Sequence, residues 1–188
     1  MLENIIEDII CAKNNCAYIS ALSLALTLPN ILSNIEYGKQ THKQEYIEWF
    51  DQWVYKYYKQ PKSKNDFINK GIEATKFDGE NCYLLRCALL HSGNTDLKDN
   101  KGNRKIDLFE LCVSQTSIHC GDASVCDVST NGTHNVYVSV NVVGLIDSLI
   151  AGAKEYIVTN SDKILRSQNN NITIRTFGSI KIEELKDI

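Results

Sequence analysis

Residues 80–94 read ENCYLLRCALLHSGN, and no other segment says as much about how this chain folds. The segment is almost entirely apolar, with one cation, Arg86, in its middle and one histidine, His91, close to its end. Because apolar residues flank Arg86 at most helical offsets, the segment predicts a helix that is buried on all sides. A guanidinium cannot lose its charge, and burying it without an anion is costly. We therefore expect either a carboxylate of the fold or an anionic ligand to contact Arg86.

The end of this helix is marked by a glycine. Gly93 stands where a left-handed residue is needed just past a helix end, so the helix is predicted over residues 79–91. His91 then lies in the last turn, where the helix dipole favours the imidazolium. A straight α-helix places residues five apart about 140° around its axis, so Arg86 and His91 would not share a face. Their cooperation would require a fraying helix end or a second subunit.

The rest of the N-terminal half is also predicted to be helical. Apolar residues recur at helical spacing in residues 2–12, and residues 16–35 form an apolar helix that Pro29 interrupts. A third helix, residues 43–58, carries an aromatic stripe that we assign to the core. The stripe consists of Tyr46, Trp49, Phe50, Trp53 and Tyr57.

Two carboxylates of these helices are the candidate partners of Arg86 within the fold. Asp51 lies at the edge of the aromatic stripe, where it would be partly buried. Glu36 directly follows the apolar helix and is the partner that the sequence favours. A carboxylate in either place would compensate the guanidinium, because a buried charge is tolerated when it is paired.

The C-terminal half predicts a small sheet and one more helix. Alternating apolar residues predict strands at residues 106–113 and 136–142. An Asn-Gly turn pair just before the second strand makes residues 125–129 its antiparallel partner. Residues 142–157 have apolar residues at helical spacing, and residues 172–182 alternate again as short strands.

The chain is therefore predicted to be an α+β protein of one domain, residues 1–188. A mainly helical bundle comes from the N-terminal half, residues 1–94. A small antiparallel sheet comes from the C-terminal half, residues 95–188, together with one further core helix. The length and the 43% hydrophobic content suit one globular core, and we find no internal repeat or long linker that would divide it.

Composition narrows the classes of function. The formal net charge of −3 argues against a nucleic-acid coat protein that relies on bulk positive charge. The first residues lack the basic region of a secretory signal, and the longest apolar run, residues 17–28, is too short to span a bilayer. We therefore expect a cytoplasmic protein with no membrane contact, whose seven cysteines are reduced thiols. The cysteines form no CxxC and no zinc pattern, so no metal or other cofactor is expected.

Residues 86–91 resemble the RxxxxH signature of the HEPN superfamily, whose members are helical bundles that commonly dimerise. A wider pattern within residues 16–94 also resembles a group of uncharacterised bacterial proteins. This pattern consists of LPN at 28–30, IEY at 35–37, YIEWFD at 46–51 and LRCALLH at 85–91. The strand-rich remainder of the chain is not something that the HEPN core predicts.

The resemblance implies a function. Many HEPN proteins are metal-independent ribonucleases of toxin–antitoxin, abortive-infection and CRISPR-linked defence systems, and others are non-catalytic binding or regulatory modules. For this chain the resemblance implies a homodimer that cuts RNA through Arg86 and His91, with an antitoxin protein as a further expected partner. Active members usually carry a polar residue after the arginine, and Cys87 departs from that pattern.

RNA cleavage without a metal requires groups for three tasks. A base takes the proton of the 2′-hydroxyl, an acid protonates the leaving oxygen, and a cation stabilises the charge on the phosphate. His91 has the chemistry for the proton transfers, and Arg86 has it for a bidentate phosphate contact. Ser92 and Asn94 follow at the same helix end as candidate hydrogen-bond donors to the substrate. One copy supplies one such histidine and one such arginine, so a two-fold dimer would form a fuller site.

Two functions of different classes remain open. The first is a metal-independent endoribonuclease of a defence or toxin type, with Arg86 and His91 as the catalytic residues. The candidate substrate-binding residues are Ser92, Asn94, Glu36 and Asp51. The second is a non-catalytic interaction or regulatory module in which Arg86 forms a structural ion pair. A nuclease would expose Arg86 and His91, whereas such a module would bury Arg86 against a carboxylate and leave His91 isolated.

Overall fold

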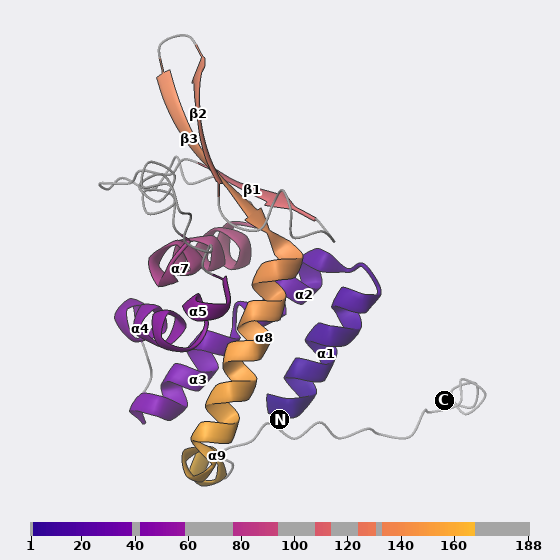
Figure 1. The fold of residues 1–188 in the computed structure, drawn as a ribbon, viewed down its shortest axis with the longest axis vertical. Helices are drawn as coiled ribbons and strands as arrows, with labels where there is room; N and C mark the ends of the chain where they lie inside the picture. Colours follow the sequence, from indigo (N-terminus) through magenta and orange to yellow (C-terminus); the bar gives the residue numbers. More distant parts are fainter. Residues whose placement is uncertain are drawn as a thin grey trace, which may run out of the picture.

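The computed structural model describes residues 2–38, 42–58, 77–93, 108–113, 124–130 and 133–167. These residues form a group of packed helices with a small sheet at one end (Figure 1). The architecture is mainly helical and belongs to the α+β class that the sequence predicts. The short strands predicted at residues 172–182 lie outside the described residues.

The helices and strands follow the predicted segments closely. The helices are α1 (Leu2–Asn14), α2 (Tyr18–Ala25), α3 (Leu28–Tyr37), α4 (Lys43–Trp53), α5 (Tyr55–Tyr58), α7 (Gly79–Cys87), α8 (Val142–Thr159) and α9 (Ser161–Ser167). The strands are β1 (Leu108–Cys112), β2 (Ser124–Thr130) and β3 (Thr133–Asn141). Each helix and strand predicted within the described residues is present, although two of the predicted helices are each divided into two by a short break.

The break between α2 and α3 accommodates a proline. It comes at Leu26 and Thr27, where the Thr27 hydroxyl donates a 2.7 Å hydrogen bond to the carbonyl oxygen of Leu24. Pro29 then lies in the first turn of α3, where its missing N–H leaves no helical hydrogen bond unmade. The predicted interruption is therefore confirmed, and its position follows from the backbone chemistry of proline.

The segment Tyr18–Tyr37, which covers α2 and α3, is long and apolar enough to cross a membrane by length and composition alone. It is the one such segment in the part of the chain that the structure describes. Core helices pass the same test, and this segment packs against α1, α4 and α8. Its completely buried side chains include Leu22, Leu26, Leu28 and Leu32. In this structure the segment therefore forms part of the protein core.

α8 joins the helical half to the sheet. It follows β3 directly, runs past the other helices and packs against α2, α3, α4 and α5 (Figure 1). Gly152 permits a close approach, because a Cβ there would lie 2.8 Å from both the Trp53 carbonyl oxygen and Val54 Cγ2. The same hydrophobic cluster includes Phe109 and Val138 of the sheet. The N-terminal and C-terminal halves therefore share buried apolar side chains.

The sheet has the strand order β1–β3–β2. β2 and β3 pair antiparallel, as the Asn-Gly turn predicts, whereas β1 pairs with β3 in parallel. The sheet is therefore mixed, and the prediction of a wholly antiparallel sheet is wrong for β1, because alternation identifies a strand without giving the direction of its neighbour. The register sets Phe109 beside Val138, and both are buried. On the other face Ser139 donates a 2.8 Å hydrogen bond to the carboxylate of Glu110.

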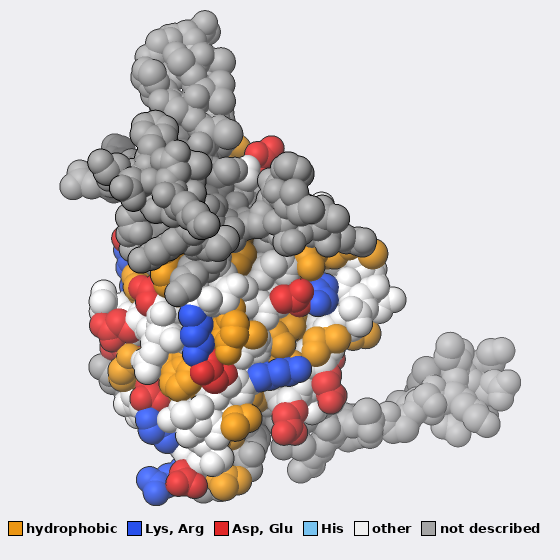
Figure 2. Space-filling view, in the orientation of Figure 1, with side chains coloured by type: hydrophobic (Ala, Val, Ile, Leu, Met, Phe, Trp, Pro, Cys, Tyr) orange, Lys and Arg blue, Asp and Glu red, His pale blue; other side chains and the backbone are white. Residues whose placement is uncertain are grey.

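The surface over these helices carries charges of both signs. On the face shown in Figure 2, lysine and arginine side chains are interspersed with aspartate and glutamate, and hydrophobic side chains lie between them. Ion pairs connect neighbouring helices to α8, including Lys13 with Asp147 and Lys56 with Glu155. Each exposed pair adds little stability by itself, and the described residues of this face carry both signs of charge side by side.

Candidate functional site

The start of α7 is anchored to the rest of the fold by two aspartates. Asp78 caps the helix, and its carboxylate accepts a 3.2 Å hydrogen bond from the backbone N–H of Asn81. Asp51 on α4 accepts a 2.8 Å bond from the backbone N–H of Gly79. A Cβ at Gly79 would lie 2.5 Å from a backbone oxygen of α4, so glycine lets α7 pack directly on that helix. These contacts position Arg86 beside the aromatic side chains of α4.

The guanidinium of Arg86 lies against two tyrosine rings. Its Cζ atom is 5.9 Å from the ring centroid of Tyr46 on α4 and 6.0 Å from that of Tyr83 on α7. The two rings meet edge to face, with centroids 5.4 Å apart and planes at 71°. At these distances the ring faces attract a cation. Arg86 is therefore half-buried, and aromatic faces stabilise its charge.

Neither carboxylate that the sequence proposed for Arg86 pairs with it. Asp51 holds the start of α7, as described above. Glu36 is turned toward α8 and α9, where it accepts a 2.8 Å bond from the Tyr156 hydroxyl and two of 2.8 Å from Lys163 Nζ. Among the described residues no carboxylate forms an ion pair with Arg86. Its Nε atom is buried and has no hydrogen-bond partner there.

The second half of the segment that holds Arg86 and His91 is not a regular α-helix. α7 continues into a π-helical turn, η1 (Ala88–Ser92), in which the Gly93 N–H bonds to the carbonyl oxygen of Ala88, five residues earlier. Such a turn brings residues five apart closer to a common face than an α-helix does. Gly93 ends it in the left-handed conformation, with φ of 64°, as predicted. The helix predicted over residues 79–91 is therefore present, and its last turn has π rather than α geometry.

His91 lies within this widened turn, and its side chain is exposed. Arg86 is five residues earlier. A π turn directly changes the angle around the helix axis between two residues at this spacing. Short π turns within α-helices occur frequently at functional sites. Residues 80–92 contain no proline or glycine, so the sequence gives no indication of the π turn. The Ser92 side chain and Asn94, the other candidates at this helix end, lie outside what the structure describes.

Two cysteines of α7 contact the two tyrosines. Cys82 is completely buried, and burial raises the pKa of its thiol to about 12. Its sulfur is 3.5 Å from the hydroxyl of Tyr46, which also donates a 3.1 Å bond to the carbonyl oxygen of Leu26. Cys87 is half-buried, and burial together with this neighbouring cysteine raises the pKa of Tyr83. The hydroxyl of Tyr46, whose ring lies beside the guanidinium, therefore contacts a thiol of α7.

The fold and the site define a mainly helical α+β protein with a half-buried arginine and an exposed histidine on one distorted helix. Within the described ranges, no three His, Cys, Asp or Glu side chains are grouped as metal ligands. No protein family, curated protein or solved structure matches the chain. What the site does is therefore inferred from its own residues.

Proposed function

We propose that the protein is a metal-independent endoribonuclease of a defence or toxin type, in which Arg86 contacts the scissile phosphate and His91 transfers protons. The observation that carries the proposal is the state of Arg86. Its guanidinium is half-buried, no carboxylate of the described residues pairs with it, and its buried Nε–H has no acceptor there. An exposed histidine follows in the widened turn of the same helix. These are the cation and the proton-transfer group that such cleavage requires.

A phosphate would supply the anion that the described residues do not place beside Arg86. Contact with an aromatic face stabilises a cation by about 0.5–2 kcal/mol, which is less than the several kcal/mol by which removal from water destabilises an ion. The planar guanidinium offers N–H donors in a fork that matches two oxygens of a phosphate. Arg86 is thus suited to bind an anionic substrate and to stabilise the charge that develops on it.

The alternative function depends on an ion pair that the described residues do not form. Both carboxylates accept hydrogen bonds from other groups, Glu36 from the Tyr156 hydroxyl of α8 and Asp51 from the Gly79 N–H of α7. A non-catalytic module with a structural Arg86 pair therefore has no specific contact in its support. The half-buried arginine and the exposed histidine favour the nuclease instead.

We further propose that two copies act together, as the resemblance to the HEPN superfamily implies. One chain supplies one Arg86 and one His91, whereas cleavage needs both a base and an acid. A two-fold axis that brings two η1 turns together would place two histidines and two arginines around one RNA backbone. We expect this dimer to act in the cytoplasm and an antitoxin protein to restrain it by covering these turns.

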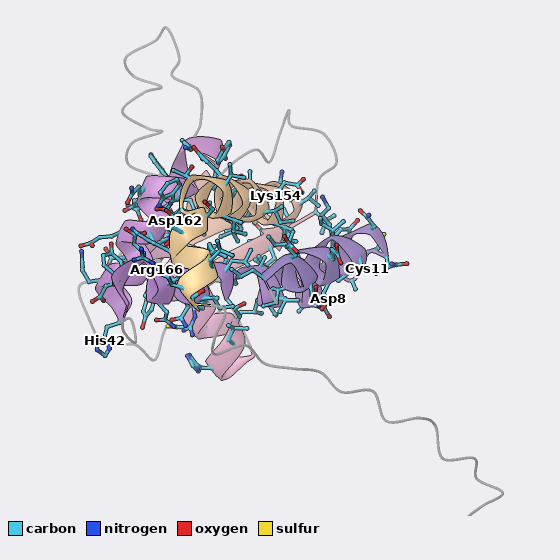
Figure 3. The ribbon with its side chains drawn as sticks, turned by 90° about the horizontal axis from the view of Figure 1, so that it is seen from below. Asp8, Cys11, His42, Lys154, Asp162 and Arg166 are labelled. Carbon is cyan, nitrogen blue, oxygen red and sulfur yellow. The ribbon has the colours of Figure 1, made fainter. Side chains whose placement is uncertain are left out.

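Cleavage of a mixed panel of single-stranded RNAs in excess EDTA tests the proposal. The variants are Arg86→Lys, which keeps the charge and loses the planar fork, and His91→Asn. The matched controls are Arg166→Lys and His42→Asn, since both residues are exposed and lie outside α7 (Figure 3). Circular dichroism and light scattering establish that each variant has the fold and the oligomeric state of the wild type.

We expect the wild type to cut RNA and both site variants to lose about a hundredfold or more in rate. The two control variants should cut like the wild type. If the wild type leaves every RNA intact, or if folded His91→Asn cuts as fast as the wild type, the proposed function is wrong. A requirement for a divalent cation would overturn its metal-independent character.

A further inference from the structure

The two tyrosines beside Arg86 are held in different ways. Tyr46 is only 1% exposed, and its hydroxyl is bonded within the core, so it belongs to the hydrophobic interior. Tyr83 is half-buried and stands three residues before Arg86 on α7, so the two side chains are neighbours on one helix face. We infer that Tyr83 is a positioning residue, whose ring holds the Arg86 guanidinium in the orientation that contacts the RNA phosphate. This inference rests on the proposed function.

Contacts on several sides hold the ring of Tyr83 in place. The ring packs edge to face against Tyr46, with the two ring centroids 5.4 Å apart. Lys43 Nζ lies 6.0 Å from the ring centroid and forms a 2.8 Å ion pair with Glu80. A ring that is held in this way restricts the long, flexible side chain that lies against it.

An aromatic ring orients a cation without occupying its hydrogen-bond donors. A carboxylate would also orient Arg86, but it would take up the N–H groups that a phosphate needs and would neutralise the charge. The face of Tyr83 leaves those donors available. Preorganisation of this kind affects rate, because misplacing a catalytic group by about 1 Å can lower the rate by about a hundredfold. Among the described residues, Arg86 thus has an aromatic ring beside it and no paired carboxylate. Both features leave its N–H donors available to the phosphate.

Substitutions of Tyr83 separate the ring from its hydroxyl. Tyr83→Phe keeps the ring face and loses only the hydroxyl, whereas Tyr83→Leu removes the face. The matched control is Tyr57→Leu, because Tyr57 on α5 also has a cation over its ring, with Lys56 Nζ 5.3 Å from the centroid. Each full-length variant is assayed on the RNA that the wild type cuts fastest.

We expect Tyr83→Leu to lower kcat by about ten- to a hundredfold with little change in KM. The reason is that the lost ring contact orients the guanidinium in the transition state. Tyr83→Phe should stay within about threefold of the wild-type kcat, since the ring face is retained. Tyr57→Leu should cleave like the wild type. Circular dichroism and urea unfolding show what share of each variant is folded, so that kcat refers to folded protein.

A double-mutant cycle distinguishes positioning from a general structural defect. With Arg86→Lys there is no guanidinium to orient, so Tyr83→Leu should then reduce the rate by less than about threefold. A structural defect would reduce it by the same factor in both backgrounds. The Arg86 Nε–H resonance provides a readout that needs no cleavage. The Tyr83 ring should add to the shift from Tyr46 in the wild type and in Tyr83→Phe, and this added shift should be lost in Tyr83→Leu.

The outcomes separate this inference from the proposed function. If the wild type cuts RNA and Tyr83→Leu cuts equally fast, or loses the same factor in both backgrounds, the inference is wrong and the ribonuclease stands. If the wild type cuts no RNA, both are overturned. A loss of kcat that depends on Arg86, together with the lost shift of its Nε–H resonance, supports the positioning role.

Discussion

The hydroxyl of the buried Tyr156 donates a 2.8 Å hydrogen bond to Glu36, which lies 120 positions earlier in the chain. Lys163 completes the group, with its Nζ atom 2.8 Å from both carboxylate oxygens. Trp49 and Trp53 pack edge to face on the Tyr156 ring. Although partial burial raises the pKa of Glu36, the hydrogen bonds from Lys163 and Tyr156 outweigh it and lower the pKa. One carboxylate thus joins α3, α8 and α9.

Acid should weaken this junction. A carboxyl group with a lowered pKa stabilises the folded state above the pKa of the unfolded chain, and this contribution is lost as the pH falls through the folded pKa. We expect the stability advantage of the wild type over Glu36→Gln to shrink between about pH 6 and pH 3, because the amide does not titrate. Urea unfolding across this range measures it. An advantage that stays constant with pH would show that Glu36 is not ionised in this contact.

The close packing of α7 on α4 makes Gly79 sensitive to substitution. In Gly79→Ala the new Cβ would lie 2.5 Å from a backbone oxygen, which cannot move aside without shifting α4. We expect urea unfolding to show a loss of about 1–3 kcal/mol. Gly144→Ala on α8 is the control, because its nearest atoms are side-chain atoms at 3.3 Å. Wild-type stability of Gly79→Ala would argue against this close approach.

Asp51 and Arg86 should contribute to stability independently. Asp51→Ala removes the acceptor of the Gly79 N–H, which we expect to destabilise the protein by about 1 kcal/mol. Because the two residues form no ion pair, adding Arg86→Lys should change the free energy of unfolding additively, within about 0.5 kcal/mol. Urea unfolding of the two single variants and the double variant measures the coupling. A coupling above about 1 kcal/mol would restore the structural ion pair of the alternative function.

Cys82 should resist alkylation in the folded protein. The thiolate is the reactive form, and a buried thiol with a pKa of about 12 stays protonated at about pH 8. Cys11 and Cys16 are exposed and should react, and Figure 3 shows Cys11 at the outer surface of α1. Peptide mass spectrometry after iodoacetamide treatment compares the sites, with urea-unfolded protein as the fully reactive control. Rapid labelling of Cys82 in the folded protein would contradict its burial.

Local patterns were sufficient for most of the helices and for one hairpin. Apolar spacing predicts α1 and α8, because one buried face of a helix repeats every 3.6 residues and needs no knowledge of its partner. The Asn-Gly pair at 131–132 predicts the β2–β3 hairpin through its turn chemistry. Arg86 could be singled out as a site residue since a cation within an apolar run requires an explanation. Each of these inferences depends on residues close together in the chain.

The partners of the charged residues depended on contacts between distant segments. Glu36 meets Lys163, 127 positions away, and no local pattern indicates that pairing. The parallel direction of β1 and the contact of the Tyr46 ring with Arg86 likewise arise only when the helices and strands pack. The amino-acid order alone was enough to specify the helices, the hairpin and an arginine in need of an anion, because these follow from short-range periodicity and burial. Only the tertiary structure determined that neither Glu36 nor Asp51 pairs with Arg86, because other groups from distant segments bind these two carboxylates.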